Sequence, residues 1–467
     1  MRVLLTAHQF LPKYSGGTEV VTRDTALELL ARGHDVHVLA VDPAARGKSI
    51  DVSHEDYEYH GLKVRMIGLP RRKSRLDIIR EAYDHDLVAE HVRRYAKLVR
   101  PDVVHMFHLS RLSGSVIDVF RELGTPLVYT PTDFWAVCAR STLQKPSGEL
   151  STGPDELSSN CLECQGAREL FPEDVLPETA DARGFYRELA RRALARAEGE
   201  HPNMALVRAM LARTAFLRER INSLDAILAP TKLMYRMLTA NGIDPALIQI
   251  SPYGLDASAF RGAGRPRSEG DGLRVGFMGT IHQQKGLHVL LEAFERLPRE
   301  SGATLRVCGD LRSYPDYARK VYSMAGGDPR INFAGSFPNV RMPDELGKID
   351  VLAVPSTWYE NTPLVIYSAF AAGIPVVASN LGGMAEVVRD GENGLLFEPG
   401  DPDDLARRLR LLIDEPGLLE RLGEGAGDVR SVEDSVDEIL ALYERLRAGK
   451  RQRLASDVAA PRTSEEG

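Results

Sequence analysis

The chain has 467 residues, of which 43% are apolar and 27% are charged, and its formal net charge is −7. A chain of this length exceeds what one hydrophobic core serves, so two domains of ordinary size are expected. The negative charge argues against the positive surface of a nucleic-acid-binding protein, and we expect no nucleic-acid partner.

The N-terminus and the cysteines bear on where the protein works. The apolar run in MRVLLTAHQF is too short for a signal peptide. No stretch reaches the roughly 18 apolar residues of a transmembrane helix. Four cysteines in a chain without a signal indicate reduced thiols, so we expect a cytoplasmic protein.

The first domain is expected over residues 1–260 as an alternation of strands and helices. Its opening elements are a strand at residues 2–7, a loop with Gly16 and Gly17, a helix at residues 18–33 and a strand at residues 35–40. Further apolar strands are predicted at residues 101–109, 125–130 and 225–230. Unbroken apolar strands between helices are typical of a parallel sheet covered on both faces, here a doubly wound, Rossmann-like domain.

Two segments fall outside this alternation. Residues 134–220 hold paired cysteines and many arginines, and we expect them to form an insertion in the first domain. Residues 261–272 contain no large apolar side chain and are expected to be the linker to the second domain.

The second domain is expected over residues 273–430 and repeats the opening design of the first. Its elements are a strand at residues 273–280, a loop ending in Lys285 and Gly286, a helix at residues 287–297, and strands at residues 304–310, 350–355 and 375–379. The fold class is therefore α/β, with two doubly wound domains facing a central crevice. The strand ends of such domains are the expected ligand site.

The last segment is predicted to be a helix over residues 431–449. Ser431 and Asp434 resemble a capping box at its start. One stripe of the helix is apolar, so we expect it to pack back on the first domain; the stripe is Val432, Val436, Ile439, Tyr443 and Leu446. The polar residues 450–467 are expected to be a disordered tail.

The stretch WYENTPLVIYSAFAAG, residues 358–373, predicts a phosphate site at the start of a helix. Asn361 or Thr362 can cap the helix, Pro363 suits its first position, and Gly373 suits the residue just past its end. Free amides at such a start attract anions. Glu360 adds a carboxylate suited to sugar hydroxyls.

Two further features favour phosphate binding. The backbone of Gly16 and Gly17 can approach an anion closely at the start of the following helix. Lys285 offers a positive point charge after the first strand of the second domain. Each feature alone is also compatible with an ordinary turn, so their convergence carries the prediction.

Several motifs together resemble the retaining, nucleotide-sugar-dependent glycosyltransferases of family 4, which have the GT-B fold. In the second domain these are SPYGLD, GTIHQQKGLHVLLEAF, YENTPLVIYSAFAAGIPVVAS and NLGGMAEVVRDGENGLLFEPGD. In the first domain YSGGTEVVTRDTALELLARGHDVHVLA, PDVVHMFHLSRLSG and YTPTDFWAVCAR agree with the same family. The resemblance covers most of residues 1–448.

The resemblance implies transfer of a sugar from a nucleotide-diphosphate sugar to an acceptor hydroxyl, with retention at the anomeric carbon and no catalytic metal. Lys285 is then expected to hold the diphosphate and Glu360 the hydroxyls of the donor sugar. Donor contacts are also expected from Gly16, Gly17, Asn361, Thr362, Pro363, Leu364 and Ser368. The nucleotide base is expected against residues 331–338.

Three positions depart from the family pattern. The second glutamate of the family, which accepts from both ribose hydroxyls, is replaced by Ser368. A water or another residue bridges to the ribose, the site is weakened, or donor binding is lost; we favour the first because the surrounding motif is intact. Thr280 stands where many relatives have an arginine, which leaves Lys285 as the phosphate charge.

The third departure concerns the histidine expected near the reacting sugar. The usual His-x-His is replaced by His105 and His108 in HMFH. We interpret His105 as a packed strand residue and His108, closer to the strand's end, as the candidate catalytic histidine. Asp133, after another strand, is a weaker candidate for contact with the acceptor.

The insertion carries two open alternatives. Cys138, Cys161 and Cys164 are either a structural zinc site that lacks an identified fourth ligand or a loop with free thiols. The arginines of residues 187–199, with Arg208, Arg213, Arg218, Arg220 and residues 71–75, are either a solvated surface or a basic face. A basic face would attach to anionic lipid at the inner membrane surface or capture a lipid-linked, phosphate-bearing acceptor.

The function implied by the resemblance is that of a retaining hexosyl- or related transferase in cell-surface glycan, glycolipid or natural-product synthesis. Its co-substrate is a nucleotide-diphosphate sugar, and no cofactor is expected. Two alternatives stay open: a non-catalytic GT-B-like binding or scaffolding protein, and a sugar-nucleotide epimerase of the same fold.

Overall fold

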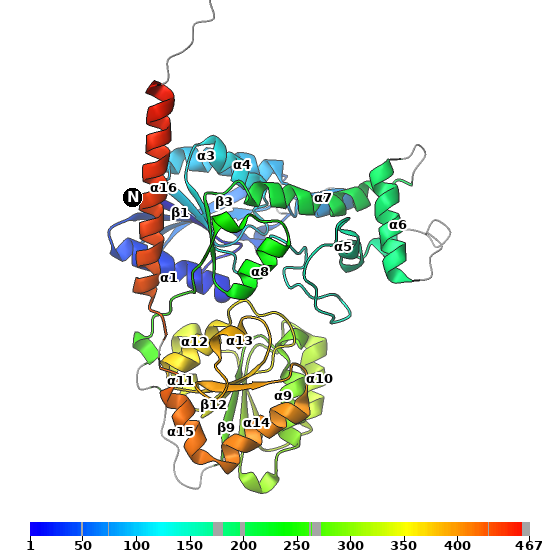
Figure 1. The fold of residues 1–467 in the computed structure, drawn as a ribbon, viewed down its shortest axis with the longest axis vertical. Coiled ribbons are helices and arrows are strands. Elements are labelled where there is room, and N and C mark those ends of the chain that lie inside the picture. The colour runs from blue at the N-terminus through cyan, green and yellow to red at the C-terminus, as the bar shows by residue number, and fades with distance from the viewer. Residues whose placement is uncertain are drawn as a thin grey trace, which may run out of the picture. The chain divides into compact units, whose positions relative to one another are not determined.

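The structure is a computed structural model that describes residues 1–47, 50–72, 74–170, 181–196, 201–260, 263, 272–427 and 429–459. The chain forms two compact units. The first comprises residues 1–230, 234–252 and 432–467, and the second comprises residues 231–233 and 253–431. Each unit is built on its own sheet (Figure 1).

The first unit contains an eight-stranded sheet in the order β3-β4-β2-β1-β5-β6-β7-β8. All neighbouring strands are parallel except the edge pair β3–β4. The strands are β1 (Arg2–Thr6), β2 (Asp35–Asp42), β3 (Ser53–Tyr59), β4 (Leu62–Gly68), β5 (Val103–Met106), β6 (Leu127–Tyr129), β7 (Ala226–Ala229) and β8 (Ile248–Ile250). Strands β5 and β7 are fully buried, and β1 is buried from Val3 to Thr6, which explains their apolar sequences.

Helices cover the sheet of the first unit. They are α1 (Gly17–Ala31), α2 (Arg75–Arg80), α3 (Asp86–Val99), α4 (Ser115–Glu122), α5 (Ser159–Cys164), α6 (Ala182–Ala195), α7 (Met204–Ile221), α8 (Lys232–Ala240) and α16 (Val432–Ala459). Short 3₁₀ helices occur at η1 (Pro43–Ala45), η2 (Ala167–Leu170) and η4 (Pro245–Leu247). Helices α5, α6 and α7 lie between β6 and β7 in the chain and form the inserted segment.

The C-terminal helix α16 belongs to the first unit and lies beside α1 (Figure 1). Its Tyr443 hydroxyl lies 2.6 Å from Nδ1 of His105, whose Nε2 lies 2.7 Å from the hydroxyl of Thr130. His105 is completely buried, in agreement with its interpretation as a packed strand residue. The expected disordered tail is wrong for residues 450–459, which continue α16, while residues 460–467 lie outside the described part.

The second unit contains six parallel strands in the order β11-β10-β9-β12-β13-β14. They are β9 (Arg274–Met278), β10 (Thr304–Cys308), β11 (Ile331–Gly335), β12 (Val351–Val354), β13 (Val376–Ser379) and β14 (Gly394–Phe397). This order, in which the third, second and first strands are followed by the fourth, fifth and sixth, is that of a Rossmann domain. The order reverses between β9 and β12, where ligands of such sheets bind.

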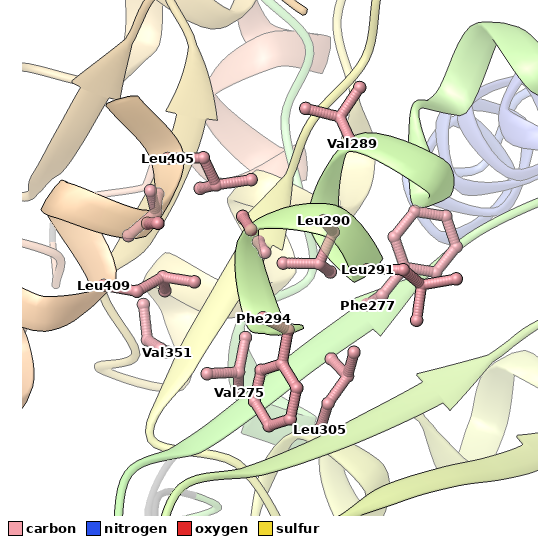
Figure 2. Close-up of a cluster of buried hydrophobic side chains, with 14 of the residues drawn as sticks. Val275, Phe277, Val289, Leu290, Leu291, Phe294, Leu305, Val351, Leu405 and Leu409 are labelled. Carbon is pink, nitrogen blue, oxygen red and sulfur yellow. The ribbon is translucent and has the colours of Figure 1, made fainter. Parts of the chain in front are cut away.

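The helices of the second unit are α9 (Leu287–Glu295), α10 (Pro315–Ala325), α11 (Met342–Leu346), α12 (Leu364–Ala371), α13 (Met384–Val387), α14 (Pro402–Asp414) and α15 (Pro416–Glu424). Its 3₁₀ helices are η5 (Ser258–Phe260), η6 (Gln283–Lys285), η7 (Arg299–Ser301) and η8 (Asn339–Arg341). Figure 2 shows how Leu290 and Phe294 of α9 meet strand residues such as Val275 and Leu305, while Leu405 and Leu409 of α14 close the same core. This packing fixes the start of α9, and hence the loop before it.

The segment between the domains differs from the expected boundaries. Residues 253–260 belong to the second unit, because Leu255 bonds through its amide to the carbonyl of Arg430. Most of the expected linker, residues 261–262 and 264–271, lies outside the described residues.

Candidate functional site

The loops after β9 and β12 bring Lys285 and Glu360 together at the reversal point of the second unit's sheet. The Lys285 ammonium donates to Oε1 of Glu360 at 2.6 Å. The carboxylate of Glu360 is buried, whereas the lysine side chain is 29% exposed. A positive and a negative group therefore meet where a ligand of this sheet would lie.

Gly286 makes this approach of the two loops possible. Its φ of +71° is in the left-handed region, and a Cβ there would lie 1.7 Å from the carbonyl oxygen of Pro355. The amide of Thr357 also donates to the carbonyl of Gln284 at 2.8 Å. Only glycine fits this contact, and it sets Lys285 against the loop that carries Glu360.

Glu360 accepts two further hydrogen bonds from its own loop. The Ser356 hydroxyl lies 2.8 Å and the Trp358 indole nitrogen 2.9 Å from Oε1, the same oxygen that Lys285 contacts. The lysine ammonium also lies 5.6 Å from the centroid of the Trp358 ring. The sequence did not single out Ser356 or Trp358, although both lie within four residues of Glu360.

The helix predicted after Glu360 is present as α12, but its start differs from the expectation. Pro363 is the N-cap residue, so neither Asn361 nor Thr362 caps the helix. The Asn361 side-chain oxygen instead accepts from the hydroxyl of Thr231 at 3.0 Å, and the buried hydroxyl of Thr362 has no partner among the described residues. The first helical amides begin at Leu364.

The end of α12 agrees with the prediction, and Ser368 lies inside the helix. Gly373 follows the C-cap Ala372 with a φ of +71°. The buried Ser368 hydroxyl donates to the carbonyl of Leu364 at 3.1 Å, one turn earlier in the helix. Its proton is thus used within the helix, and only its lone pairs remain for a ligand.

In the first unit, Gly16 and Gly17 lie at the N-terminus of α1, as the sequence predicted. Gly16 is the N-cap residue, and its amide donates to Oε2 of Glu19 at 2.6 Å. A Cβ at residue 16 would lie 2.6 Å from the same oxygen, so the Glu19 carboxylate would have to shift. Glu19 is 1% exposed, and burial raises the pKa of its carboxyl.

His108 and Asp133 lie together at the neighbouring strand ends of β5 and β6. The amide of Ser110 donates to Nδ1 of His108 at 2.9 Å, so the imidazole proton resides on Nε2. Nε2 in turn lies 2.8 Å from the Asp133 carboxylate. The carboxylate therefore fixes the orientation and the tautomer of the candidate histidine.

His8 completes this cluster and was not predicted. Its ring centroid lies 4.5 Å from that of His108, and its Nε2 lies 3.3 Å from Oε1 of Glu19. Burial, followed by the charges of His108 and Arg111, lowers the pKa of His8 to about 2. His8 Nδ1 and Glu19 Oε1 are both buried without a hydrogen-bond partner among the described residues. The Gly16-x-x-Glu19 spacing was the one sequence signal for this arrangement.

The cysteines of the insertion line one small cavity. Cys138, Cys161 and Cys164 all contribute to its wall and all are free thiols. Burial, with the neighbouring Cys138 and Cys164, raises the pKa of Cys161 to about 12. Within the described ranges, no group of three or more His, Cys, Asp or Glu residues is arranged to hold a metal ion. The two alternatives predicted from the sequence, a zinc site and a loop with free thiols, therefore both stay open.

Two of the arginines considered for a basic face make contacts within the first unit instead. Arg213 is 6% exposed, donates to the Trp135 carbonyl and lies 5.3 Å from the centroid of that ring. Arg220 pairs with Asp118 at 2.7 Å. Both arginines therefore stabilise the first unit. Of the arginine-rich segment 187–199, residues 197–199 lie outside the described part.

Two family models cover most of the chain. Residues 265–428 match the model described as "Glycosyl transferases group 1", and residues 16–254 match the "Glycosyl transferase 4-like domain". The second match alone spans more than half of the 467 residues. The boundary between the matches falls close to that between the two units.

Curated relatives have moderate identity over part of the chain. The D-inositol 3-phosphate glycosyltransferase of Rhodococcus jostii (strain RHA1) is 34% identical over 218 residues, which are 43% of this chain and 48% of the relative. The lipopolysaccharide core biosynthesis glycosyltransferase LpsE of Rhizobium meliloti (strain 1021) is 33% identical over 173 residues, 37% of this chain and 49% of the relative. The chain spans about half the length of the curated relatives it matches.

Solved structures share the fold over nearly the whole chain. Sucrose-phosphate synthase from Thermosynechococcus elongatus has a TM-score of 0.67 and 18% identity, covering 96% of this chain and 99% of that one. Anabaena Alr3699/HepE in complex with UDP and glucose has a TM-score of 0.60 and 17% identity, covering 98% and 99%. These neighbours establish a GT-B fold.

In the described part of the chain, no helix combines the length and apolar character needed to cross a bilayer.

Proposed function

Since the chain belongs to the group 1, family 4-like glycosyltransferases, we propose that it moves a sugar from a nucleotide-diphosphate sugar to an acceptor hydroxyl with retention at the anomeric carbon. The observation that carries the proposal is the Lys285–Glu360 pair at the reversal point of the second unit's sheet. The donor would occupy the second unit and the acceptor the first.

The charges of the second unit suit a departing diphosphate. Lys285 and the first-turn amides of α12, beginning with Leu364, would neutralise the negative charge that develops as the sugar–phosphate bond breaks. We propose that these groups do so in place of a divalent cation. The acceptor oxygen forms the new bond to the anomeric carbon, and its proton passes to the departing diphosphate oxygen.

Glu360 is proposed to orient the donor sugar. All three hydrogen bonds that it accepts from described side chains end on Oε1. Oε2 is thereby left for sugar hydroxyls, to which an ionised carboxylate bonds strongly. On the first unit, His108 held by Asp133 is the proposed catalytic histidine, and Gly16 and Gly17 are proposed to approach the donor phosphates.

The four free thiols support a cytoplasmic location.

The first test is thermal stabilisation of the full chain by UDP, GDP and ADP, with Lys285→Ala as the matched variant. HepE is described in complexes with UDP and with UDP-glucose, so UDP is the expected ligand. A nucleotide at a hundred times its dissociation constant stabilises the folded state by about 2.7 kcal/mol. We expect a shift with one base that is lost in Lys285→Ala, while the melting temperature of the ligand-free variant stays near that of the wild type.

The remaining outcomes separate the alternatives. No shift with any of the three nucleotides would favour a non-catalytic binding protein. Release or epimerisation of the sugar in a donor-only incubation would favour an epimerase. For an identified acceptor, proton NMR of the product reports the anomeric configuration, and an inverted product would overturn retention. Activity that chelation abolishes would overturn metal independence.

A further inference from the structure

Three arginines gather at one edge of the first unit's sheet. Arg72 follows β4, Arg46 follows β2 through the short helix η1, and Arg111 follows β5. The strand order β4-β2-β1-β5 makes these strands neighbours, and all are parallel. The carboxyl ends of parallel strands meet at the same edge of a sheet, so the three arginines share it.

Hydrogen bonds join two of the three loops to each other and join the third to the loop after β1. The amide of Gly47 donates to the carbonyl of Leu69 at 3.0 Å, which joins the Arg46 loop to the segment leading to Arg72. The Arg111 guanidinium donates to the Gln9 side chain at 2.9 Å and to the carbonyl of His8 at 3.3 Å. The arginine cluster therefore reaches the loop that carries His8 beside His108.

The cluster holds more positive than negative charge. In the described part of the chain its one ion pair joins Arg72 to Glu81 at 3.3 Å, and no carboxylate lies within ion-pair distance of Arg46 or Arg111. The charge of Glu19 also acts on Arg111, so three guanidinium groups face two carboxylates and the formal excess is one positive charge. Burial, followed by the charges of Arg72 and Arg111, lowers the pKa of Arg46.

A buried polar atom beside the cluster also lacks a partner. His85 is 2% exposed, and its Nε2 has no hydrogen-bond partner among the described residues. This nitrogen lies 3.7 Å from Oε2 of Glu81, the carboxylate that faces Arg72. Burial, with the charge of Arg72, lowers the pKa of His85 to about 4, so the ring is neutral and adds no charge of its own.

We propose that Arg46, Arg72 and Arg111 bind a phosphate monoester carried by the acceptor. The excess positive charge attracts the anion, and guanidinium groups fit its oxygens geometrically. Arg111 lies three residues after His108, so an acceptor held by its phosphate would present hydroxyls to the His8, Glu19 and His108 cluster. The inference rests on the proposed function in taking the first unit as the acceptor side.

The decisive variant is Arg46→Gln, because Arg46 is exposed and makes no ion pair in the described structure. Binding of inorganic phosphate to the full chain is measured by calorimetry with UDP present, so that phosphate does not report on the donor site. We expect Arg46→Gln to weaken phosphate binding roughly tenfold or more. Arg93→Gln removes an arginine of α3 that pairs with Glu90 and Glu122, and should change nothing.

Phosphate binding that is absent, or equal in Arg46→Gln and the wild type, would overturn the proposal. Retention of the UDP thermal shift in that case would leave the proposed function standing. Loss of the UDP shift with phosphate binding that depends on Arg46 would leave the anion site and overturn the function.

Two arms identify where the phosphate comes from. Hexoses and polyols are screened as acceptors with and without a phosphate monoester, and a soluble acceptor should show a KM that rises about tenfold in Arg46→Gln with kcat preserved. Vesicles of phosphatidylcholine containing phosphatidylinositol test a lipid-linked phosphate through sedimentation that depends on Arg46. Equal effects of Arg46→Gln on phosphorylated and unphosphorylated acceptors would reduce the cluster to an adventitious anion site and overturn the proposal.

Discussion

Ser368 stands where the family pattern has a glutamate, and its surroundings limit what it can do. The hydroxyl proton is directed to the Leu364 carbonyl, and the side chain is 6% exposed. A serine that donates within its own helix can only accept from a ribose, and it does so as a neutral, short side chain. Glu360, with one oxygen not engaged by the described side chains, is better placed to contribute to donor affinity.

We therefore expect Ser368→Ala to leave UDP affinity within about twofold, because no strong ligand contact is removed. Calorimetric titration of the two proteins with UDP measures the change, with Lys285→Ala as the variant that should lose binding. A loss of tenfold or more in Ser368→Ala would mean that the hydroxyl contacts the ribose directly.

At the scale of elements, the junction between η6 and α9 positions the Lys285 side chain. Gly286 combines a left-handed backbone with contact against Pro355, while Gly373 at the end of α12 has the same φ of +71° and no atom within 4 Å of a Cβ. The two glycines thus form a matched pair that differs only in packing.

Gly373→Ala should cost about 1–2 kcal/mol of unfolding free energy from backbone strain alone. Gly286→Ala should cost more and should also lower UDP affinity, since the loop must move away from Pro355 and take Lys285 with it. Chemical denaturation and UDP titration of both variants test this. Equal costs, with UDP affinity unchanged, would show that the contact with Pro355 is unimportant.

The elements predicted correctly are those with a strong local signal. Buried parallel strands such as β9 and β12 have unbroken apolar sequences, and Gly373 is a recognisable helix stop. The edge strand β3, Ser53–Tyr59, was not predicted because it is polar and mostly exposed, and only its pairing with β4 makes it a strand. The C-terminal end of α16 was missed because residues 450–459 lack a continuous apolar stripe.

The residues of the candidate site that follow strands were predicted from the sequence. The residues that reach the site through side-chain packing were missed. Lys285 and Glu360 follow strands, so their convergence was predictable from the fold. Trp358 also contacts Lys285, and Glu19 also contacts His8; these two long-range contacts are not visible in the sequence. Arg213 was counted among surface arginines because its burial against Trp135, 78 residues away in the chain, leaves no local trace.

At the scale of the whole molecule, the two units differ in their buried histidines. The first unit holds His8, His85, His91 and His105, with pKa values lowered to about 2, 4, 4 and 3, mainly by burial. An unfolded histidine binds a proton below about pH 6.5, whereas these folded ones do not. Their contribution to stability is present above pH 6.5 and is lost as the pH falls toward the folded values.

Acidification from pH 7 to pH 5 should therefore lower the melting temperature of the first unit more than that of the second. Each such histidine lowers the unfolding free energy by about 1.4 kcal/mol for each pH unit below its unfolded pKa. Glu19 and Glu81, whose pKa values burial raises, offset part of the loss. Calorimetric scans at both pH values, with UDP marking the second unit's transition, measure the difference, and a first transition insensitive to pH would contradict it.

The return of α16 to the first unit has a consequence for synthesis on the ribosome. The second unit is contained within residues 231–431, whereas the first needs a helix that begins at Val432. Although domains made earlier usually fold earlier, the first unit here must wait with His105 lacking its Tyr443 partner. The half of the protein that leaves the ribosome first is thus the half that is completed last.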